Sequence, residues 1–152
     1  MQTGPFKIRR LTENDSRQWL DLRRRLWDGL SEAEHIAEMR EIFGHRETQL
    51  VLVAEYGEGR IAGFLEASIR PFVEDCRTDH VGYIEGWFVL NEHRRKGIGS
   101  ALVRSAEAWA KENSCEEMAS DTEIGNEQGL AAHLGLGFKE TSRLIHLRKE
   151  IT

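Results

Sequence analysis

Hydrophobic positions in the first third of the chain change period, and each period predicts a type of element. In FKIRRL (6–11) apolar and basic residues alternate, which is typical of a half-buried strand. Thr12 then offers a helix cap, and apolar residues recur at helical spacing from Trp19 to Trp27. A second helix is predicted over 32–43, where a glycine follows. The chain is therefore expected to begin with a strand and two helices.

The same patterns, with the turn residues between them, predict the remaining elements. They are a hairpin of 49–56 with 61–70, a strand over 83–90, a helix from Ile98, a short strand over 116–121, a helix over 126–134, and a closing hairpin of 138–140 with 143–149. This order predicts an α/β (α+β) fold with a mixed central sheet and helices on both of its faces.

Composition narrows the class of protein. The chain has 152 residues, 39% hydrophobic and 31% charged, so one domain over 1–152 is expected. No apolar run approaches a membrane span, and the N-terminal segment lacks the apolar stretch of a secretory signal. Cys76 and Cys115 cannot form a disulfide framework or zinc site alone, and His35 and His45 lack the HExxH spacing. A cytoplasmic, reduced protein without membrane segment or metal is expected.

The net charge of −5 argues against a general nucleic-acid-binding protein, but the charges are unevenly distributed. In HRRKGIGS (93–100) three cations directly precede two glycines. Acidic residues concentrate elsewhere, at Glu66, Glu74, Asp75, Asp79, Glu85, Glu116, Glu117 and Asp121. One part of the surface is thus predicted to attract an anion and another part a cation.

The stretch HRRKGIGS lies where a predicted strand ends and a predicted helix begins. The first N–H groups of a helix lack intrahelical acceptors and lie at its positive end, so they bind phosphate readily. Gly97 and Gly99 let an anion approach the backbone closely, and Arg94, Arg95 and Lys96 add positive charge. The stretch matches neither GxGxxG nor GxxxxGK[ST], so these residues alone leave open an ordinary basic turn.

In context, the strand IEGWFVL followed by NEHRRKGIGSALV resembles the acetyl-CoA motif of the GNAT superfamily, R/Q-x-x-G-x-G/A. Arg94, Gly97 and Gly99 match its fixed positions, and AAHLGLGF is similar to a later family segment that ends in LGF. The resemblance covers nearly the whole chain and implies the GNAT fold, with a mostly antiparallel sheet. It implies acetyl-CoA as cosubstrate, its pyrophosphate held by the loop and its pantetheine arm beside the preceding strand. The cofactor-binding residues implied are Phe88, Val89, Arg94, Arg95, Lys96, Gly97, Ile98, Gly99, Ser100 and Asn126.

A narrower resemblance rests on six short segments in their order along the chain. RLW, LEASIR, EGWFVL, RRKGIG, EMASDT and LGFKET together resemble bacterial aminoglycoside 6′-N-acetyltransferases. This implies acetyl transfer to the 6′-amine of an aminoglycoside, which gives antibiotic resistance. It also implies a homodimer, because the related enzymes pair through C-terminal strands. The apolar-centred segment 143–149 agrees with such an edge.

Two acids are predicted to be both catalytic and substrate-binding. An acetyltransferase must position an amine, take up a proton and stabilise developing negative charge. Glu85 lies in the strand predicted to flank the acetyl group, and Asp121 ends the neighbouring strand, where open sheets commonly place ligands. In the aminoglycoside enzymes the matching acids bind sugar amines, and a base acts through water. Taken singly, each acid is also typical of a solvated surface charge.

The predicted acceptor site also contains Glu66, with Trp27 and Trp87 as walls of the sugar site. Trp19 and Trp27, at helical spacing, equally fit a hydrophobic core. The run from Arg23 to Arg25 is predicted to form a solvated helix face.

His133 departs from the family pattern. GNAT enzymes commonly have a tyrosine in LY-x-x-LGF that protonates the thiolate, whereas AAHLGLGF has a histidine there. Imidazole donates a proton near neutral pH, so His133 is a candidate catalytic acid. The alternative is a structural histidine on a helix.

Three functions remain open from the sequence. The leading hypothesis is the aminoglycoside enzyme, whose polycationic acceptor agrees with the acid-rich composition of one side. The second keeps the transfer but changes the acceptor to a polyamine, a protein N-terminus or a lysine side chain. The third is a non-catalytic acyl-CoA-binding or regulatory module on the same fold, and the glycine loop does not separate these three.

Overall fold

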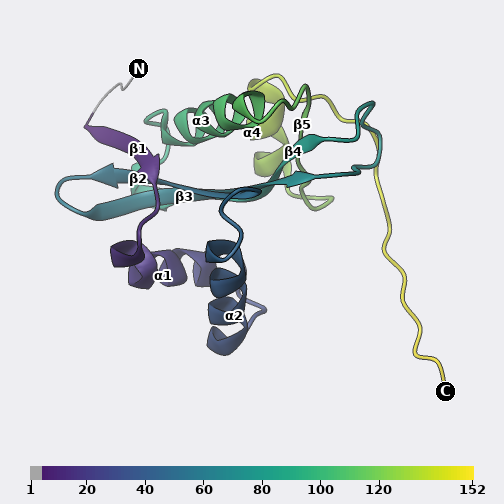
Figure 1. Ribbon diagram of the computed structural model, residues 1–152, viewed down its shortest axis with the longest axis horizontal. Coiled ribbons are helices and arrows are strands. Elements are labelled where there is room, and N and C mark those ends of the chain that lie inside the picture. The colour runs from purple at the N-terminus through teal and green to yellow at the C-terminus, as the bar shows by residue number, and fades with distance from the viewer. Residues whose placement is uncertain (1–4) are drawn as a thin grey trace. The chain divides into compact units, whose positions relative to one another are not determined.

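A computed structural model describes residues 5–152 as two compact units, which divide after Ser120. The first unit is built on a five-stranded sheet whose strands follow chain order, as the ribbon in Figure 1 shows. The strands are β1 (Phe6–Arg10), β2 (Gln49–Tyr56), β3 (Arg60–Arg70), β4 (Val81–Val89) and β5 (Met118–Ala119). The pairs from β1 to β4 are antiparallel and β5 runs parallel to β4. The predicted mixed, mostly antiparallel sheet is confirmed.

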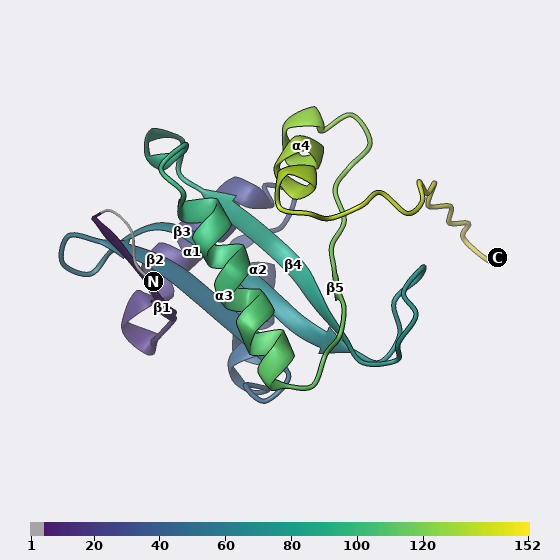
Figure 2. The ribbon, with the colours of Figure 1, turned by 90° about the horizontal axis from the view of Figure 1, so that it is seen from above.

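Helices cover both faces of this sheet. The helices α1 (Ser16–Leu26) and α2 (Glu32–Phe43) lie on one face, and α3 (Ile98–Glu112) lies on the other (Figure 1). Seen from above, α3 lies across β2, β3 and β4 (Figure 2). Each amphipathic helix therefore buries its apolar side against the sheet and leaves its polar side in water.

Polar residues fix where the first two helices begin. Before α1, a short 3₁₀ helix η1 (Glu13–Asp15) starts after Thr12, whose N–H donates to the Asp15 carboxylate at 2.8 Å. At α2, the N–H of Glu34 donates to the Ser31 hydroxyl and the Ser31 N–H donates to the Glu34 carboxylate. This reciprocal capping box satisfies two of the N–H groups at a helix end.

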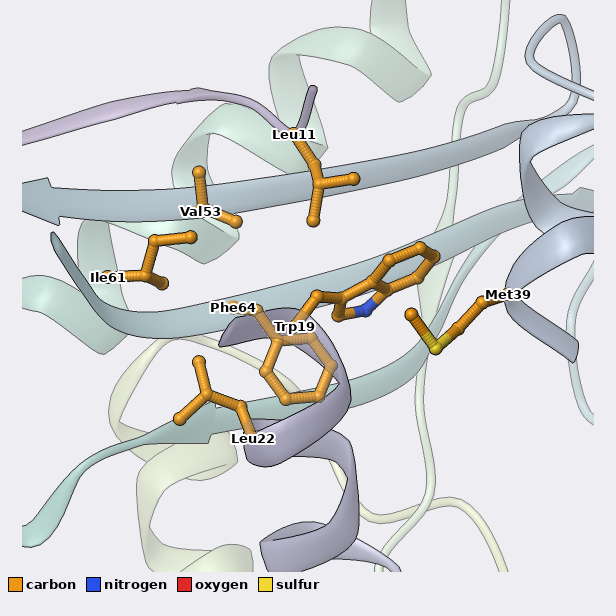
Figure 3. Close-up of a cluster of buried hydrophobic side chains, with 7 residues drawn as sticks. All are labelled: Leu11, Trp19, Leu22, Met39, Val53, Ile61 and Phe64. Carbon is orange, nitrogen blue, oxygen red and sulfur yellow. The ribbon is translucent and has the colours of Figure 1, made fainter. Parts of the chain in front are cut away.

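A cluster of buried apolar side chains fills the space between the sheet and the first two helices (Figure 3). Its members are Leu11, Trp19, Leu22, Met39, Val53, Ile61 and Phe64. The Trp19 ring is fully buried and meets Phe43 edge-on at 5.8 Å between centroids. Burial of each large side chain stabilises the fold by about 1.5–3 kcal/mol, so this cluster fixes α1 and α2 on β2 and β3.

An irregularity in β4 changes the direction of one side chain. Glu66 of β3 pairs with Gly86 of β4, but the next residue, Ala67, pairs with Ile84. Glu85 is therefore the extra residue of a β-bulge, which lies opposite no single partner on β3. The bulge turns Glu85 toward the face that carries Glu66 rather than toward α3.

The second unit (Asp121–Thr152) contains α4 (Glu127–Gly135) and a Schellman motif that ends it. The Phe138 N–H donates to the His133 carbonyl at 3.2 Å and the Gly137 N–H to the Leu134 carbonyl at 3.1 Å. Gly137 has a φ of 95°, which glycine adopts without a Cβ penalty. The sequence prediction of a helix with a glycine stop is confirmed.

The closing hairpin predicted for 138–140 and 143–149 is wrong, because residues 138–152 contain no strand. Four of their apolar side chains, Leu144, Ile145, Leu147 and Ile151, are exposed, with Leu147 at 90% and Ile151 at 96%. An alternating pattern forms a strand only where backbone N–H and C=O groups find a partner strand. The predicted strand over 116–121 is also shorter, since β5 ends at Ala119 and does not include Asp121.

Candidate active site

The first unit contains an open hollow of about 280 Å³. It is lined by Trp27, Glu38, Glu41, Ile42, Gln49, Glu66 and Glu85. Three of the predicted acceptor residues, Trp27, Glu66 and Glu85, are thus brought together from α1, β3 and β4. Glu38 and Glu41 of α2 were not predicted, although their spacing of three places them on one helix face. Four carboxylates line this hollow and, in the described part of the chain, only two arginines pair with them, so the excess of negative charge favours a cationic ligand.

Trp27 forms a wall of this hollow at the point where α1 ends. Its N–H still donates to the Arg23 carbonyl at 2.8 Å, but its ψ of 83° takes the chain out of the helix. The indole meets the Phe64 ring edge-on at 6.3 Å and lies against Gly86 of β4. The ring is held between the hydrophobic cluster and the sheet.

Glu85 is held from two sides by residues of β3. The Ser68 hydroxyl donates to its Oε2 at 2.5 Å, and Arg70 donates from Nε to Oε2 at 3.0 Å and from Nη2 to Oε1 at 2.7 Å. The Arg70 guanidinium in turn lies 3.6 Å from the centroid of the Tyr83 ring. Such a bidentate pair fixes the orientation of the carboxylate. The Glu85 carboxylate is therefore held in one orientation at the hollow.

Glu66 is the deepest acid of the hollow, with 4% of its surface exposed. It accepts hydrogen bonds from Arg23 Nη1, at 2.7 and 2.5 Å, and from the Trp19 indole N–H at 2.9 Å. Burial raises the pKa of the Glu66 carboxyl above its usual range, whereas the charge and hydrogen bonds of Arg23 act against this rise.

The solvated helix face predicted for Arg23 to Arg25 is wrong at its first residue. Arg23 is 1% exposed, whereas the side chain of Arg24 is 54% exposed and Arg25 is exposed. A helix turns by 100° per residue, so only one of three successive side chains points at the sheet. The sequence of three successive arginines does not indicate which of them is buried.

The predicted anion loop connects β4 to α3. A 3₁₀ helix η2 (Asn91–His93) follows β4, Arg95 and Gly97 have positive φ values of 64° and 83°, and α3 begins at Ile98. The first intrahelical bond runs from the Ala101 N–H to the Gly97 carbonyl at 3.0 Å, so the N–H groups of residues 98–100 have no acceptor within the helix. A Cβ built on Gly97 meets no atom within 4 Å, so the loop is open at this residue.

The side chains of this loop have different surroundings. Arg94 turns back to β4, where its Nε donates to the Val89 carbonyl at 2.8 Å and its guanidinium lies 5.6 Å from the Phe88 ring centroid. Arg95 and Lys96 are exposed, and Ser100 is half-buried. Ile98 is 2% exposed, so only its backbone is available to a ligand.

Trp87 and Phe88 point to opposite faces of the sheet. Phe88 packs on the hydrophobic cluster beneath α1, whereas Trp87 contacts α3, where a Cβ on Gly99 would lie 3.2 Å from its ring. Trp87 is not among the residues that line the hollow. Gly99 thus has a packing reason to be glycine, in addition to any contact with a ligand.

The ladder between β4 and β5 consists of the pairs Gly82–Met118 and Tyr83–Ala119. Beyond Tyr83, β4 continues to Val89 without a β5 partner. This stretch, which contains Phe88 and Val89, leads directly into the anion loop. An extended ligand arm can lie along such a strand edge.

Three predicted site residues belong to the second unit. Asp121 is its first residue and is exposed. Asn126 caps α4, because its side-chain oxygen accepts from the Gly129 N–H at 3.0 Å. His133 donates from Nδ1 to the Gly129 carbonyl at 2.7 Å, and its ring meets Phe138 edge-on at 5.4 Å. Through these contacts, His133 stabilises the C-terminal end of α4.

Within residues 5–152, no group of three or more His, Cys, Asp and Glu side chains is arranged to hold a metal ion. Among the helices in that range, none combines the length and the apolar character that crossing a membrane requires.

Burial raises the pKa of the Cys115 thiol, which disfavours the thiolate form that a nucleophile needs.

Residues 17–138 match the acetyltransferase (GNAT) family. The chain belongs to this family. It is 38% identical to an aminoglycoside N(6′)-acetyltransferase type 1 of Klebsiella aerogenes, over 99% of this chain and 100% of that protein. It is 40% identical to the enzyme of the same name from Acinetobacter baumannii, over 96% of this chain and 99% of that one.

Solved structures give the same result. The fold superimposes with a TM-score of 0.88 on an aminoglycoside antibiotic 6′-N-acetyltransferase from Acinetobacter haemolyticus, at 39% identity, over 96% of this chain and 99% of that one. A second relative, AAC(6′)-Iy in complex with a bisubstrate analogue of CoA and acetylneamine, has a TM-score of 0.89 and 34% identity over 96% of this chain and 99% of that chain. The family, the fold and the resemblance to aminoglycoside enzymes are therefore confirmed.

Proposed function

We propose that this protein transfers the acetyl group of acetyl-CoA to the 6′-amine of aminoglycoside antibiotics and thereby gives resistance to them. The observation that carries the proposal is the hollow that brings four carboxylates and one indole together in the first unit. Aminoglycosides carry several protonated amines, and each ion pair at about 4 Å contributes roughly 1–4 kcal/mol, depending on screening. Near-complete alignment with proteins of this activity supports the same substrate class.

The residues between β4 and α3 fit the cosubstrate. The open backbone at Gly97, the first N–H groups of α3 and the cations Arg95 and Lys96 provide a place for the pyrophosphate. The edge of β4 beyond Tyr83 provides a place for the pantetheine arm, beside Phe88 and Val89. Ser100 of the first α3 turn and Asn126 are proposed as further contacts. When bound, acetyl-CoA supplies an activated acetyl group as a thioester.

The acids perform the binding and proton chemistry in this proposal. An amine attacks only when neutral, so a carboxylate must bind the ammonium form and a base must accept its proton. Glu85 binds the reacting amine, and Asp121 contributes to binding and to proton removal through water. Glu66, Glu38 and Trp27 hold the remainder of the sugar. His133 is the proposed acid for the departing thiolate, beside its structural contacts in α4.

Trp87 takes a different place from the one predicted by sequence. Because it contacts Gly99 on the α3 face, we propose that it supports the start of α3 and the cosubstrate loop, instead of forming a wall of the sugar site.

The second unit is proposed to be part of one functional domain with the first, since the family match extends across both. We further propose a homodimer in which residues 143–149 pair with a second copy. The exposed Leu144, Ile145 and Leu147 support this, because an apolar segment of this kind is stabilised by a partner strand. The cytoplasm is the proposed location, because acetyl-CoA is available there.

A thiol-release assay against a panel of amines tests the substrate class. The sharpest comparison uses two aminoglycosides that differ only in an amine or a hydroxyl at the 6′ carbon. We expect CoA release with the 6′-amine compound and loss of transfer to that ring with the 6′-hydroxyl compound. Higher kcat/KM for a polyamine, a peptide N-terminus or a lysine peptide would contradict the proposal, and no turnover with any amine would favour a binding module.

A further inference from the structure

Arg23 lies beneath the hollow and is almost completely buried, with 1% of its side chain exposed. All three of its guanidinium nitrogens donate hydrogen bonds. Nη1 donates to Glu66, Nη2 donates to Glu38 by a short contact, and Nε donates to His35 Nδ1 at 3.2 Å. The same guanidinium lies 4.7 Å from the centroid of the Trp27 ring. One buried cation thus contacts residues of α1, α2 and β3.

Three of these contacts are to residues that line the hollow, namely Trp27, Glu38 and Glu66. Each comes from a different element, so without a common partner their relative positions would depend on helix packing alone. The planar fork of arginine holds several acceptors in fixed directions, which a lysine ammonium does not.

His35 extends the same arrangement to the main chain of Trp27. An arginine nitrogen only donates, so Nδ1 of His35 is the acceptor and Nε2 carries the proton. Nε2 then donates to the Trp27 carbonyl at 3.1 Å. His35 is fully buried, so this neutral ring connects Arg23 to the backbone just where α1 ends. Both the ring and the main chain of Trp27 are therefore fixed by one network.

The contact between Arg23 and Glu38 distinguishes a role in positioning acceptor-binding groups from a role in the stability of the fold. The Glu38 side chain is 53% exposed and is screened by solvent, so its replacement should lower the free energy of unfolding less than replacement of the buried Arg23. The contact with Arg23 also fixes the position of the Glu38 carboxylate among the acids that line the hollow. Glu66, in contrast, is buried, and loss of Arg23 would raise the pKa of its carboxyl further, because the charge and hydrogen bonds of Arg23 oppose the rise that burial causes.

We propose that Arg23 is a positioning residue for the acceptor, which aligns Trp27, Glu38 and Glu66 so that a polycationic amine is bound in a productive orientation. The inference rests on the proposed function. In this inference the buried side chain of Arg23 touches no substrate but controls how the acceptor binds. Cosubstrate binding at the start of α3 is predicted to be independent of it.

Arg23→Lys tests the proposal, with Arg24→Lys as the matched control on the exposed side of the same helix. We expect Arg23→Lys to raise the KM for the aminoglycoside by about tenfold to a hundredfold, the range for misplaced binding groups. The dissociation constant of acetyl-CoA, measured by calorimetry, should change less than about twofold. Arg24→Lys should change neither value. A merely structural role would lower the melting temperature without separating acceptor from cosubstrate binding.

A second variant keeps the test valid if a buried lysine prevents folding. Arg23→Gln with Glu66→Gln removes both buried charges together, which is often tolerated where removal of one is not. Because Glu66 is itself a proposed acceptor contact, Glu66→Gln alone is the reference for this double variant. The double variant should raise the acceptor KM above that of Glu66→Gln, because Glu38 and Trp27 then lose their common partner. An acceptor KM equal to that of the wild type in folded Arg23→Lys, or equal to that of Glu66→Gln in the folded double variant, overturns the positioning role. Failure of the wild-type protein to acetylate aminoglycosides would instead overturn the proposed function, so the two failures are distinguishable.

Discussion

The indole of Trp27 lies directly against the backbone of Gly86. A Cβ atom at residue 86 would stand 2.4 Å from Cη2 and 2.6 Å from Cζ2 of the ring. Gly86 follows the bulged Glu85 and pairs with Glu66 across the sheet. The absence of one side chain therefore places an aromatic wall beside two acids of the hollow.

Gly86→Ala is expected to displace Trp27, because a Cβ at this distance has no room. Overpacking of this kind typically costs about 1–3 kcal/mol of stability, and the acceptor KM should rise together with it. Urea unfolding and steady-state kinetics measure the two effects. Gly29→Ala is the control, since its Cβ would meet no atom within 4 Å. If the acceptor KM of Gly86→Ala equals that of the wild type, Trp27 does not line the acceptor site.

Gly97→Val is expected to weaken acetyl-CoA binding by roughly tenfold or more, because a branched side chain enters the open space at the start of α3 and strains a φ of 83°. Gly97→Asn separates these causes, since asparagine tolerates positive φ but still fills the space. Both variants should bind acetyl-CoA weakly in calorimetry, and only the valine variant should lose much stability. Gly99→Val is a poorer test, because it also meets Trp87.

Glu85→Gln and Asp121→Asn are expected to lower kcat/KM for aminoglycosides by roughly tenfold or more while acetyl-CoA still binds, since loss of one fully engaged ion pair costs about 1.4 kcal/mol or more. In Glu85→Gln, the amide oxygen can keep the hydrogen bonds from Ser68 Oγ and Arg70 Nε, whereas the NH2 group cannot accept from Arg70 Nη2. The change therefore removes the charge and one of three hydrogen bonds but keeps the shape. Glu112→Gln, on an exposed residue at the end of α3, should leave kcat/KM unchanged. Full activity of both site variants would show that other acids bind the amine.

Asp15 is expected to make stability sensitive to acid. Hydrogen bonds from Arg9, at 2.8 and 2.9 Å, hold the pKa of the buried Asp15 carboxyl below its usual range. The stabilisation by Asp15 is therefore complete above the pKa of the carboxyl in the unfolded chain, about 3.9, and is lost as the pH falls through the lower pKa of the folded state. Asp15→Asn should lower the free energy of unfolding by about 1–3 kcal/mol at neutral pH.

The difference between the wild type and Asp15→Asn should shrink as the pH falls below about 4, because protonation of Asp15 then removes the charge that distinguishes the wild type from the uncharged variant. Denaturant unfolding across this pH range measures it. Glu13→Gln, at an exposed neighbouring residue, is expected to show no such dependence. A difference that stays constant with pH would assign the effect to shape rather than to charge.

His133→Ala is expected to slow acetyl transfer by ~10²–10⁴-fold in a single turnover if the imidazole protonates the thiolate. Single-turnover rates are needed because product release can hide the chemical step. His133→Phe is the control for the ring contact with Phe138, which either aromatic ring can make. A single-turnover rate that survives both substitutions would leave His133 with its structural contacts in α4 alone.

Local patterns in the sequence determined most elements of this protein. The strand at Phe6–Arg10, the helix at Glu32–Phe43 and the glycine stop of α4 depend on periodicity and on caps within a few residues, so each could be predicted. The loop from Arg94 to Ser100 is likewise contiguous, and its resemblance to the family motif is confirmed by the family match.

Tertiary structure alone decided which polar residues face the hollow. Three successive arginines look alike in the sequence, but the rotation of α1 on the sheet buries Arg23 and leaves Arg24 in solvent. Glu38 and Glu41 line the hollow because α2 turns that face toward it, and Glu85 lines it because of the bulge in β4. Burial and strand pairing depend on partners far along the chain. For that reason the alternating segment at 143–149 predicted a strand that forms only if it meets another edge.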